Sequence, residues 1–325
     1  MFIATLAIII GLGLLVWSAD RFLDGTAALA NHFKLPSLFM GIFIVGFGTS
    51  APEMVVSTIA AFDGVPGLAL GNALGSNIVN IGLVLGITAV ISPMIINSQI
   101  VKNELLLLIV IVLFLGYVLF DGSLTIFEGY MLLAGFALLI IWSVKTALTD
   151  RADELSSEST EELQSHEMQL KQAVTWLVVG LVVLVGSSRL LVWAAVEIAT
   201  GLGISDLIIG LTIVAIGTSL PELATTLVAV RKKEHDMAIG NVIGSSMFNI
   251  LGVVGIAGVI APFSSISENV MIRDWSVMFG LTIALFLMAY RFGKGGGINR
   301  SEGVFLVVVY LFYNVYLIYD VLITK

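Results

Sequence analysis

Long apolar segments with few charges follow one another along almost the whole chain, and they constrain the fold more than any other feature. A helix that crosses a lipid bilayer needs about 20 mostly apolar residues. The sequence predicts ten such helices, at 2–19, 38–62, 68–92, 104–120, 126–147, 172–198, 207–230, 237–262, 273–291 and 302–322. The chain is therefore expected to be an all-α membrane protein that lies in a lipid bilayer.

Composition supports this class and excludes others. Charged residues make up 12% of the chain, against about 25% in soluble domains. The absence of cysteine excludes disulfides, a thiolate metal site and a cysteine nucleophile. The net charge of -8 disfavours nucleic-acid binding, and nothing indicates an obligate protein partner. No basic region precedes the first apolar segment, so it is expected to be an uncleaved anchor.

The distribution of Lys and Arg predicts an orientation. Ten spans place both termini on one side of the membrane. If that side is outside, twelve of the fifteen Lys and Arg residues face the cytoplasm, in agreement with the positive-inside rule. We therefore predict a multi-pass protein of the plasma (inner) membrane with both termini outside. The acidic linker 148–171 is then cytoplasmic. A solvated connector is favoured over a regulatory cation site, because its carboxylates lack EF-hand spacing.

The chain also contains an internal repeat. With an offset of 169, residues 38–86 align with 207–255 without a gap, and 19 of the 49 positions are identical. The first copy reads G-F-G-T-S-A-P-E at 46–53 and then G-N-A-L-G-S-N-I-V-N, whereas the second reads A-I-G-T-S-L-P-E at 215–222 and then G-N-V-I-G-S-S-M-F-N. Shared apolar composition does not easily align Gly, Thr, Ser, Pro, Glu and Asn together.

The repeat predicts the domain organisation. Two repeated halves, 1–147 and 172–325, flank the linker 148–171, and each half holds five predicted spans. Because five is odd, the second half enters the membrane with the opposite polarity. Transporters built from such inverted repeats bind their substrates near the bilayer midplane, at the repeat interface and beside interrupted helices.

Proline interrupts one helix in each half. Pro52 lacks an N–H, so the carbonyl of Gly48 loses its helical partner, and Pro221 has the same effect on Gly217. Carbonyls freed at membrane depth must face protein or water, and a hard cation can coordinate them. The alternative interpretation is a simple kink, in which a Ser or Thr hydroxyl bonds the freed carbonyl.

A glutamate follows each proline directly. Thr49 and Ser50 precede Glu53 by four and three residues, so all three share one helix face. A carboxylate inside the membrane costs about 2.5–3.5 kcal/mol or more and indicates a functional site; a protonated glutamate bonded across helices is the structural alternative. The second motif repeats the arrangement at Thr218, Ser219 and Glu222.

The next helix adds polar side chains at four-residue spacing. Ser76 and Asn80 lie on one face, and the second half repeats the pair. Taken singly such residues join helices, but their repetition beside the glutamates favours a role as ligands. A G-x-x-x-G pattern on the same helices permits close helix approach, and Asn72 and Asn241 are expected to bridge helices. The residues of the second copy are Gly240, Gly244, Ser245 and Asn249.

The charge of the two glutamates limits which cation the site can bind. Glu53 and Glu222 carry two negative charges, which one Ca²⁺ neutralises, as do two or more Na⁺. Ca²⁺ accepts six to eight oxygen ligands, which carboxylates and backbone carbonyls supply. No His or Cys occurs in the motifs, so Zn²⁺ and Cu⁺ are disfavoured.

The doubled motifs G-T-S-x-P-E and G-N-x-x-G-S resemble those of the sodium/calcium exchanger branch of the cation/Ca²⁺ antiporter superfamily, above all its bacterial and archaeal calcium/sodium antiporters. The first motif lacks the G-N-x-x-E of proton-coupled members. The resemblance implies a Ca²⁺ site at Thr49, Glu53, Thr218 and Glu222. It also implies Na⁺ sites at Gly46, Ser50 and Ser76 and at Ala215, Ser219 and Ser245, with Asn80 and Asn249 lining the middle. Asn249 departs from the relatives that carry an aspartate there.

The expected function is Na⁺-driven Ca²⁺ export by alternating access, with the helices near 2–30 and 172–198 sliding against a core. H⁺ or K⁺ as the coupling ion is the nearest alternative, and a selective cation channel is a more remote one. An enzyme is disfavoured, because no G-x-S-x-G elbow and no histidine metal cluster occurs. No cofactor is expected beyond the transported ions Ca²⁺ and Na⁺.

Overall fold

The structure, a computed structural model, describes residues 2–64, 66–96, 99–154, 168–202, 215–266, 269–290 and 296–323. Helices form nearly all of it. In chain order the elements are α1 (Phe2–Phe33), α2 (Ser37–Phe39), η1 (Met40–Gly46), α3 (Phe47–Thr49), α4 (Ala51–Phe62), α5 (Pro66–Ile78), η2 (Val79–Leu85), α6 (Gly86–Ile91), β1 (Met94–Ile96), α7 (Gln99–Val118), α8 (Ile126–Glu154), α9 (Leu170–Gly201), α11 (Ala215–Thr218), α12 (Leu220–Arg231), α13 (His235–Phe248), η4 (Asn249–Val254), α14 (Gly255–Ile260), η5 (Val270–Trp275), α15 (Ser276–Tyr290), β2 (Gly296–Ile298) and α16 (Arg300–Ile323), where η marks π-helical segments.

The structure is that of a mostly helical membrane protein. Within the described residues seven helices are long and apolar enough to span a bilayer, and a pair bent by 44° between Thr49 and Ala51 makes eight. Of the other expected spans, 104–120 corresponds to a shorter apolar helix, Asn103–Val118, and the first part of 207–230 lies outside the described residues. The count of ten spans therefore stays a prediction.

The predicted connections differ in detail from the observed ones. The short strands β1 and β2 pair antiparallel, with Ile95 opposite Gly297, so the chain is not purely helical. The expected linker 148–171 begins inside α8, which continues to Glu154, and most of the linker lies outside the described residues.

The 169-residue offset of the sequence repeat also relates the helices. Adding 169 to the bounds of α4 gives those of α12, and adding it to α6 gives α14. The long helices α1 and α9 correspond to within one residue. Each half therefore contains the same order of a long helix, a broken helix and a helix with a π-helical middle.

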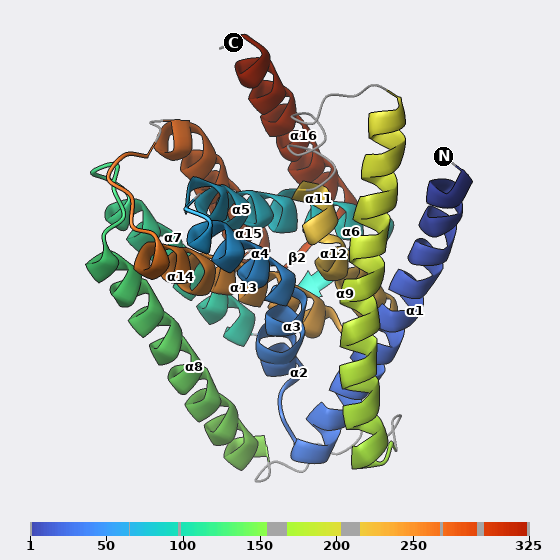
Figure 1. Cartoon of the computed structure of the whole chain (residues 1–325). Coiled ribbons are helices and arrows are strands. Elements are labelled where there is room, and N and C mark those ends of the chain that lie inside the picture. Colours follow the sequence, from blue (N-terminus) through green and yellow to red (C-terminus); the bar gives the residue numbers. More distant parts are fainter. Residues whose placement is uncertain are drawn as a thin grey trace.

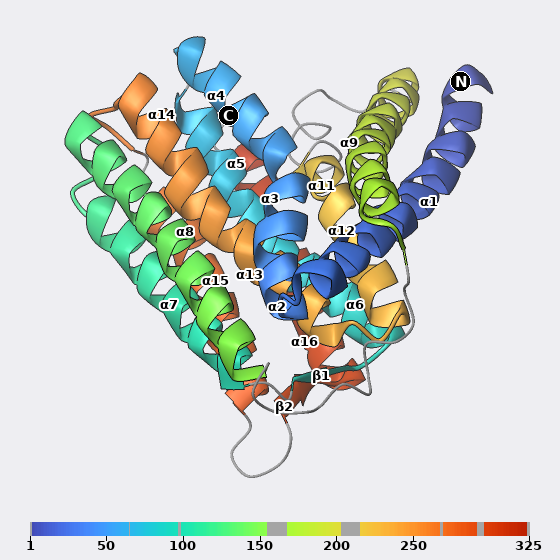
Figure 2. The same ribbon diagram turned by 90° about the horizontal axis from the view of Figure 1, so that it is seen from below.

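The long helices and the broken helices occupy different places. Figures 1 and 2 both show α1 and α9 together at one edge and α7 and α8 at the opposite edge, with α4, α5, α12 and α13 between them. The middle group contains both buried glutamates of the motifs and many of the buried polar side chains, whereas many apolar side chains of the edge helices are exposed, as expected for surfaces in contact with lipid. Buried polar side chains therefore accompany the broken helices in the middle of the molecule, away from its apolar outer surface.

Close contact between the two halves depends on glycine. Helix α13 packs against η1. A Cβ on Gly244 would lie 2.4 Å from the carbonyl oxygen of Ile42, and a Cβ on Gly41 would lie 2.5 Å from that of Met237. Both distances are too short for real atoms. The predicted G-x-x-x-G face of α13 thus brings the backbones of the two halves together.

Candidate ion-binding site

Each half breaks one helix at a serine. Ser50 lies between α3 and α4 with φ -83° and ψ -2°, and Ser219 lies between α11 and α12 with φ -93° and ψ 10°. Pro52 and Pro221 occupy the first turns that follow, where the missing N–H is tolerated. The last carbonyls of α3 and α11 carry the negative ends of their helix dipoles, so each break presents partial negative charge.

Ser50 connects the break in the first half to the glutamate of the second. A serine at the start of a helix usually accepts a hydrogen bond from its own helix, but Ser50 makes no such bond. Its Oγ instead donates to Oε1 of Glu222, over 3.3 Å. The two halves therefore share one cluster of polar groups. Ser50 precedes Glu53 by three residues, so this bond brings Glu222 to the same helix break that Glu53 follows.

Several buried oxygen and nitrogen atoms of this cluster have no hydrogen-bond partner. Both glutamates are 1% exposed, and a buried polar atom without a partner costs about 1–3 kcal/mol, more when it is charged. The unpartnered atoms are both carboxylate oxygens of Glu53, Oε2 of Glu222, the amide oxygen and nitrogen of Asn80, Oγ of Ser219 and Oδ1 of Asn249. These buried oxygens have the chemistry to act as ligands of a cation.

A second set of hydrogen bonds crosses between the halves at Gly46. Its carbonyl oxygen accepts from Oγ of Ser245 over 3.3 Å and from Oγ1 of Thr49 over 3.4 Å. Thr49 also donates to Oδ1 of Asn241, over 3.1 Å. The Asn241 amide nitrogen in turn donates to the hydroxyls of Thr225 and Thr226 on α12. Asn241 thus bridges helices, as the sequence predicts.

Asn77 belongs to the polar interior, although sequence reasoning missed it. The Asn249 amide nitrogen donates to Oδ1 of Asn77 over 3.2 Å, and Asn77 donates to the backbone oxygen of Ser246. The corresponding position in the second half is Ser246 rather than Asn. Because the residue at this position differs between the halves, the repeated motifs do not predict the pair, and its only signal is a polar side chain at each of the two positions.

The remaining predicted site residues lie on the same elements. Ser76 is buried on α5 and Ser245 on α13, while Thr218 is half-buried at the end of α11. Helix α11 begins at Ala215, of which only the backbone is described. The two asparagines expected to line the middle, Asn80 and Asn249, lie in the π-helical segments η2 and η4, a local structure that is frequent at functional sites.

One freed carbonyl is not available as predicted. The carbonyl oxygen of Gly217 accepts a 2.8 Å hydrogen bond from Oγ of Ser188 on α9. The simple-kink interpretation, in which a hydroxyl bonds the freed carbonyl, therefore holds at this position. Ser188 lies outside both motifs, so no sequence pattern pairs it with Gly217.

The donor set limits the chemistry. Two carboxylates, several hydroxyls, amide oxygens and backbone carbonyls are the ligands that hard cations prefer. Within the described residues no three His, Cys, Asp or Glu side chains gather into a metal-binding group, so the cluster does not resemble a resident transition-metal site. It carries the charge to hold one divalent ion or two monovalent ions.

Known proteins share this architecture. Residues 3–145 and 172–319 match the family described as sodium/calcium exchanger protein. CaxA of Alkalimonas amylolytica is 47% identical over 98% of this chain and 100% of its own length. The sodium/calcium exchanger MaX1 of Methanosarcina acetivorans is 30% identical over 97% of this chain and 98% of its own. The sodium-calcium exchanger NCX_Mj, soaked with Na⁺ and Ca²⁺, has a similar structure, with a TM-score of 0.81 and 30% identity over 96% of this chain and 97% of that chain.

Proposed function

The chain belongs to the sodium/calcium exchanger family, and from that premise we propose that it couples Na⁺ entry to Ca²⁺ export through one shared site. One observation carries the proposal most directly. Glu53 and Glu222 are both buried, and three of their four carboxylate oxygens have no hydrogen-bond partner. A single Ca²⁺ would neutralise both charges and satisfy these oxygens.

We propose that Thr49, Glu53, Thr218 and Glu222 hold Ca²⁺. Na⁺ would use Gly46, Ser50 and Ser76 in one position and Ala215, Ser219 and Ser245 in another, with Asn80 and Asn249 between them. These residues would act together with Glu53 and Glu222, whose charges neutralise Na⁺ as well as Ca²⁺. The two ions would then compete for the same two carboxylates, so occupancy by one excludes the other. This shared requirement couples the two fluxes, and no covalent step or cofactor is involved.

The membrane topology follows from the same proposal. Two five-span halves, related by the 169-residue offset, would enter the membrane with opposite polarity. The hydrogen bonds from Ser50 to Glu222 and from Ser245 to Gly46 support a site between the halves, as in other inverted-repeat transporters. Both termini would lie outside the plasma (inner) membrane, and the linker would be cytoplasmic.

Purified protein in vesicles tests the coupling ion. Ca²⁺ uptake is measured with outward gradients of Na⁺, K⁺ or H⁺, each applied separately under a clamped membrane potential. We expect the Na⁺ gradient to drive Ca²⁺ accumulation and the other two to drive little. If a K⁺ or H⁺ gradient drives Ca²⁺ uptake as well as the Na⁺ gradient does, the assignment of Na⁺ as the coupling ion would be wrong. Ca²⁺ flux that needs no counter-ion would indicate a channel.

Replacement of Asn249 by aspartate should make exchange sensitive to protons. Asn249→Asp adds a third carboxylate to the cluster, and one Ca²⁺ cannot neutralise three. One carboxylate should therefore take up a proton, because like charges disfavour ionisation. Acidification should then inhibit Na⁺-driven Ca²⁺ uptake more strongly in this variant than in the wild type. Asn299→Asp is the matched control, since Asn299 caps α16 and Asp is an equally good cap. Identical pH profiles for Asn249→Asp and the wild type would contradict the placement of Asn249.

A further inference from the structure

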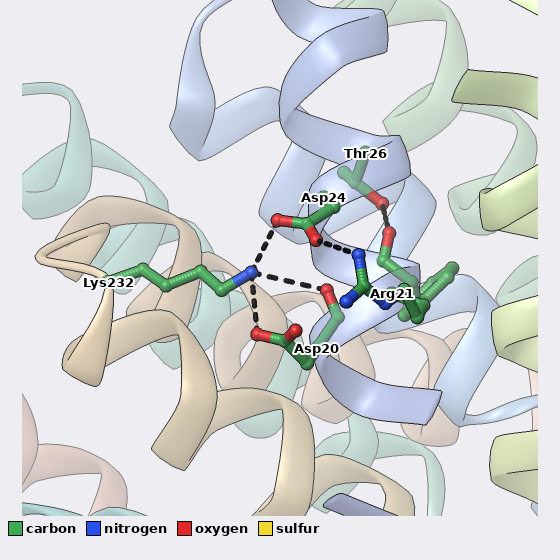
Figure 3. A network of polar contacts seen from close by, with 6 residues as sticks. Asp20, Arg21, Asp24, Thr26 and Lys232 are labelled. Atoms are coloured by element: carbon green, nitrogen blue, oxygen red, sulfur yellow. Dashed lines mark hydrogen bonds and ion pairs between the residues drawn. The ribbon is translucent and has the colours of Figure 1, made fainter. Parts of the chain in front are cut away.

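A cluster of ion pairs joins α1 to the end of α12 (Figure 3). Nζ of Lys232, directly after the last residue of α12, lies 2.8 Å from Oδ1 of Asp20 and 2.5 Å from Oδ1 of Asp24. The same nitrogen donates to the backbone oxygen of Asp20, over 3.2 Å. Asp24 also pairs with Arg21, over 3.3 Å. One lysine thus contacts three oxygens of a neighbouring helix.

The ion-pair cluster links the long helices α1 and α9 to the proposed ion-binding site. Helix α12 begins two residues before Glu222 and ends at Arg231, so a movement of Lys232 is transmitted along a rigid helix to that glutamate. Arg21 lies over the ring of Trp176 on α9, at 5.4 Å, so the cluster contacts both long helices. The Lys232 side chain is 26% exposed and that of Asp24 is 14% exposed, which reduces solvent screening of this pair relative to a surface pair.

The other half holds the same pair with its charges exchanged. The 169-residue offset places Asp63 at the position of Lys232 and Arg189 at the position of Asp20. Asp63 follows α4, the helix of Glu53, while Arg189 lies on α9. Both side chains are exposed, and the described part of the chain contains no ion pair between them. The two halves therefore have complementary charges at matching positions, but only one pair is formed.

The packing of the long helices shows the same asymmetry. Helix α1 packs along α12, whereas the corresponding pair, α9 and α4, makes at most a marginal contact. Figure 2 shows the ends of α4 and α9 apart from each other at the top of the view. Helices α1 and α12 are thus in contact where the ion pairs are formed. Helices α9 and α4 are separated where the pair with exchanged charges would form.

We propose that these two sets of residues are alternating latches. Lys232 with Asp20 and Asp24 holds α1 against α12 in the conformation seen here. Asp63 and Arg189 hold α4 against α9 in the opposite conformation, after the first latch has opened. The inference rests on the proposed function and on the alternating access expected from the sequence, and it assigns one set of ion-pairing residues to each of the long helices α1 and α9. Partly exposed pairs are weak, so each latch biases the equilibrium without blocking it.

Introduced cysteines test the proposal, because the natural chain has no cysteine to give a background reaction. In the full chain carrying Asp63→Cys and Arg189→Cys, the rate of cross-linking by a short bifunctional thiol reagent reports the opposite conformation. Adding Lys232→Gln should raise this rate roughly threefold to tenfold, since opening one latch shifts the population toward the other state. Lys232→Arg should keep the original rate, because the charge remains.

The matched control is Lys233→Gln, which removes the same charge from an exposed neighbour and should leave the rate unchanged. The pair Asp20→Asn with Asp24→Asn opens the latch from α1 and should reproduce Lys232→Gln, which guards against a folding defect in one variant. An unchanged rate in folded Lys232→Gln, or an equal rise in Lys233→Gln, would overturn the proposal. Cross-linking does not depend on which ion is transported. If Lys232→Gln raises the cross-linking rate but the wild type shows no Na⁺-driven Ca²⁺ uptake, the latch is supported and the proposed function is rejected. If uptake is present but the cross-linking rate does not change, the proposed function is supported and the latch is rejected.

Discussion

Glu53→Gln is expected to reduce Na⁺-driven Ca²⁺ uptake in vesicles to the rate of protein-free vesicles. The substitution keeps the size and shape of the side chain but removes one of the two negative charges in the polar cluster. A divalent cation would then meet a single carboxylate in a region where polar atoms are buried away from water. Glu222→Gln should have the same effect, because Glu222 occupies the matching position of the second half.

The stability of the same variants should separate a binding defect from a folding defect. Neither oxygen of Glu53 has a hydrogen-bond partner within the protein, so removal of the charge breaks no hydrogen bond and should not lower the Tm without Ca²⁺. Wild-type protein should gain about 2.7 kcal/mol of stability at a Ca²⁺ concentration 100 times its Kd. Glu53→Gln should lose that gain, as measured by the shift of the Tm with Ca²⁺.

Glu128→Gln is the matched control for this experiment. Glu128 caps the start of α8 through the backbone N–H of Thr125, and Gln serves in such a capping box as well. The Glu128→Gln variant should therefore retain both Ca²⁺ uptake and stabilisation by Ca²⁺. Normal uptake in folded Glu53→Gln would refute the assignment of the site. Loss of uptake together with a lower Tm in the absence of Ca²⁺ would instead show a structural role for the carboxylate.

The sequence predicted the fold well where a signal was local or repeated. Apolar length located the long helices, and the positions of Pro52 and Pro221 located the helix breaks within two residues. Burial of Glu53 and Glu222 followed from the apolar segments around them. These features depend on a residue and its near neighbours, which a single sequence contains in full.

The sequence could not predict which half each polar group contacts. The resemblance assigned Gly46 and Ser50 to one ion, yet the Gly46 carbonyl bonds Ser245 and the Ser50 hydroxyl bonds Glu222. Such partners are set by the way α13 crosses η1, which is a property of packing rather than of spacing. For the same reason the sequence could not predict that Ser188 would bond the Gly217 carbonyl, because helix α9 shares no motif with it.

Gly244→Ala is expected to disrupt the contact on which this shared site depends. The added Cβ would lie 2.4 Å from the backbone oxygen of Ile42, and backbone atoms cannot rotate away as a side chain does. Helix α13 would have to separate from η1, and Ser245, the next residue, would move from its 3.3 Å hydrogen bond with Gly46. Overpacking of this kind typically costs about 1–3 kcal/mol.

The variant should therefore show both a lower Tm and loss of Na⁺-driven Ca²⁺ uptake, and added Ca²⁺ should restore little of the Tm because the ligands from the two halves no longer meet. Gly13→Ala provides the comparison, since a Cβ there meets nothing within 4 Å and the residue is exposed on α1. It should keep uptake and Tm close to the wild type. If Gly244→Ala shows wild-type uptake, α13 and η1 can move apart without loss of transport. That result would contradict a binding site formed between the two halves.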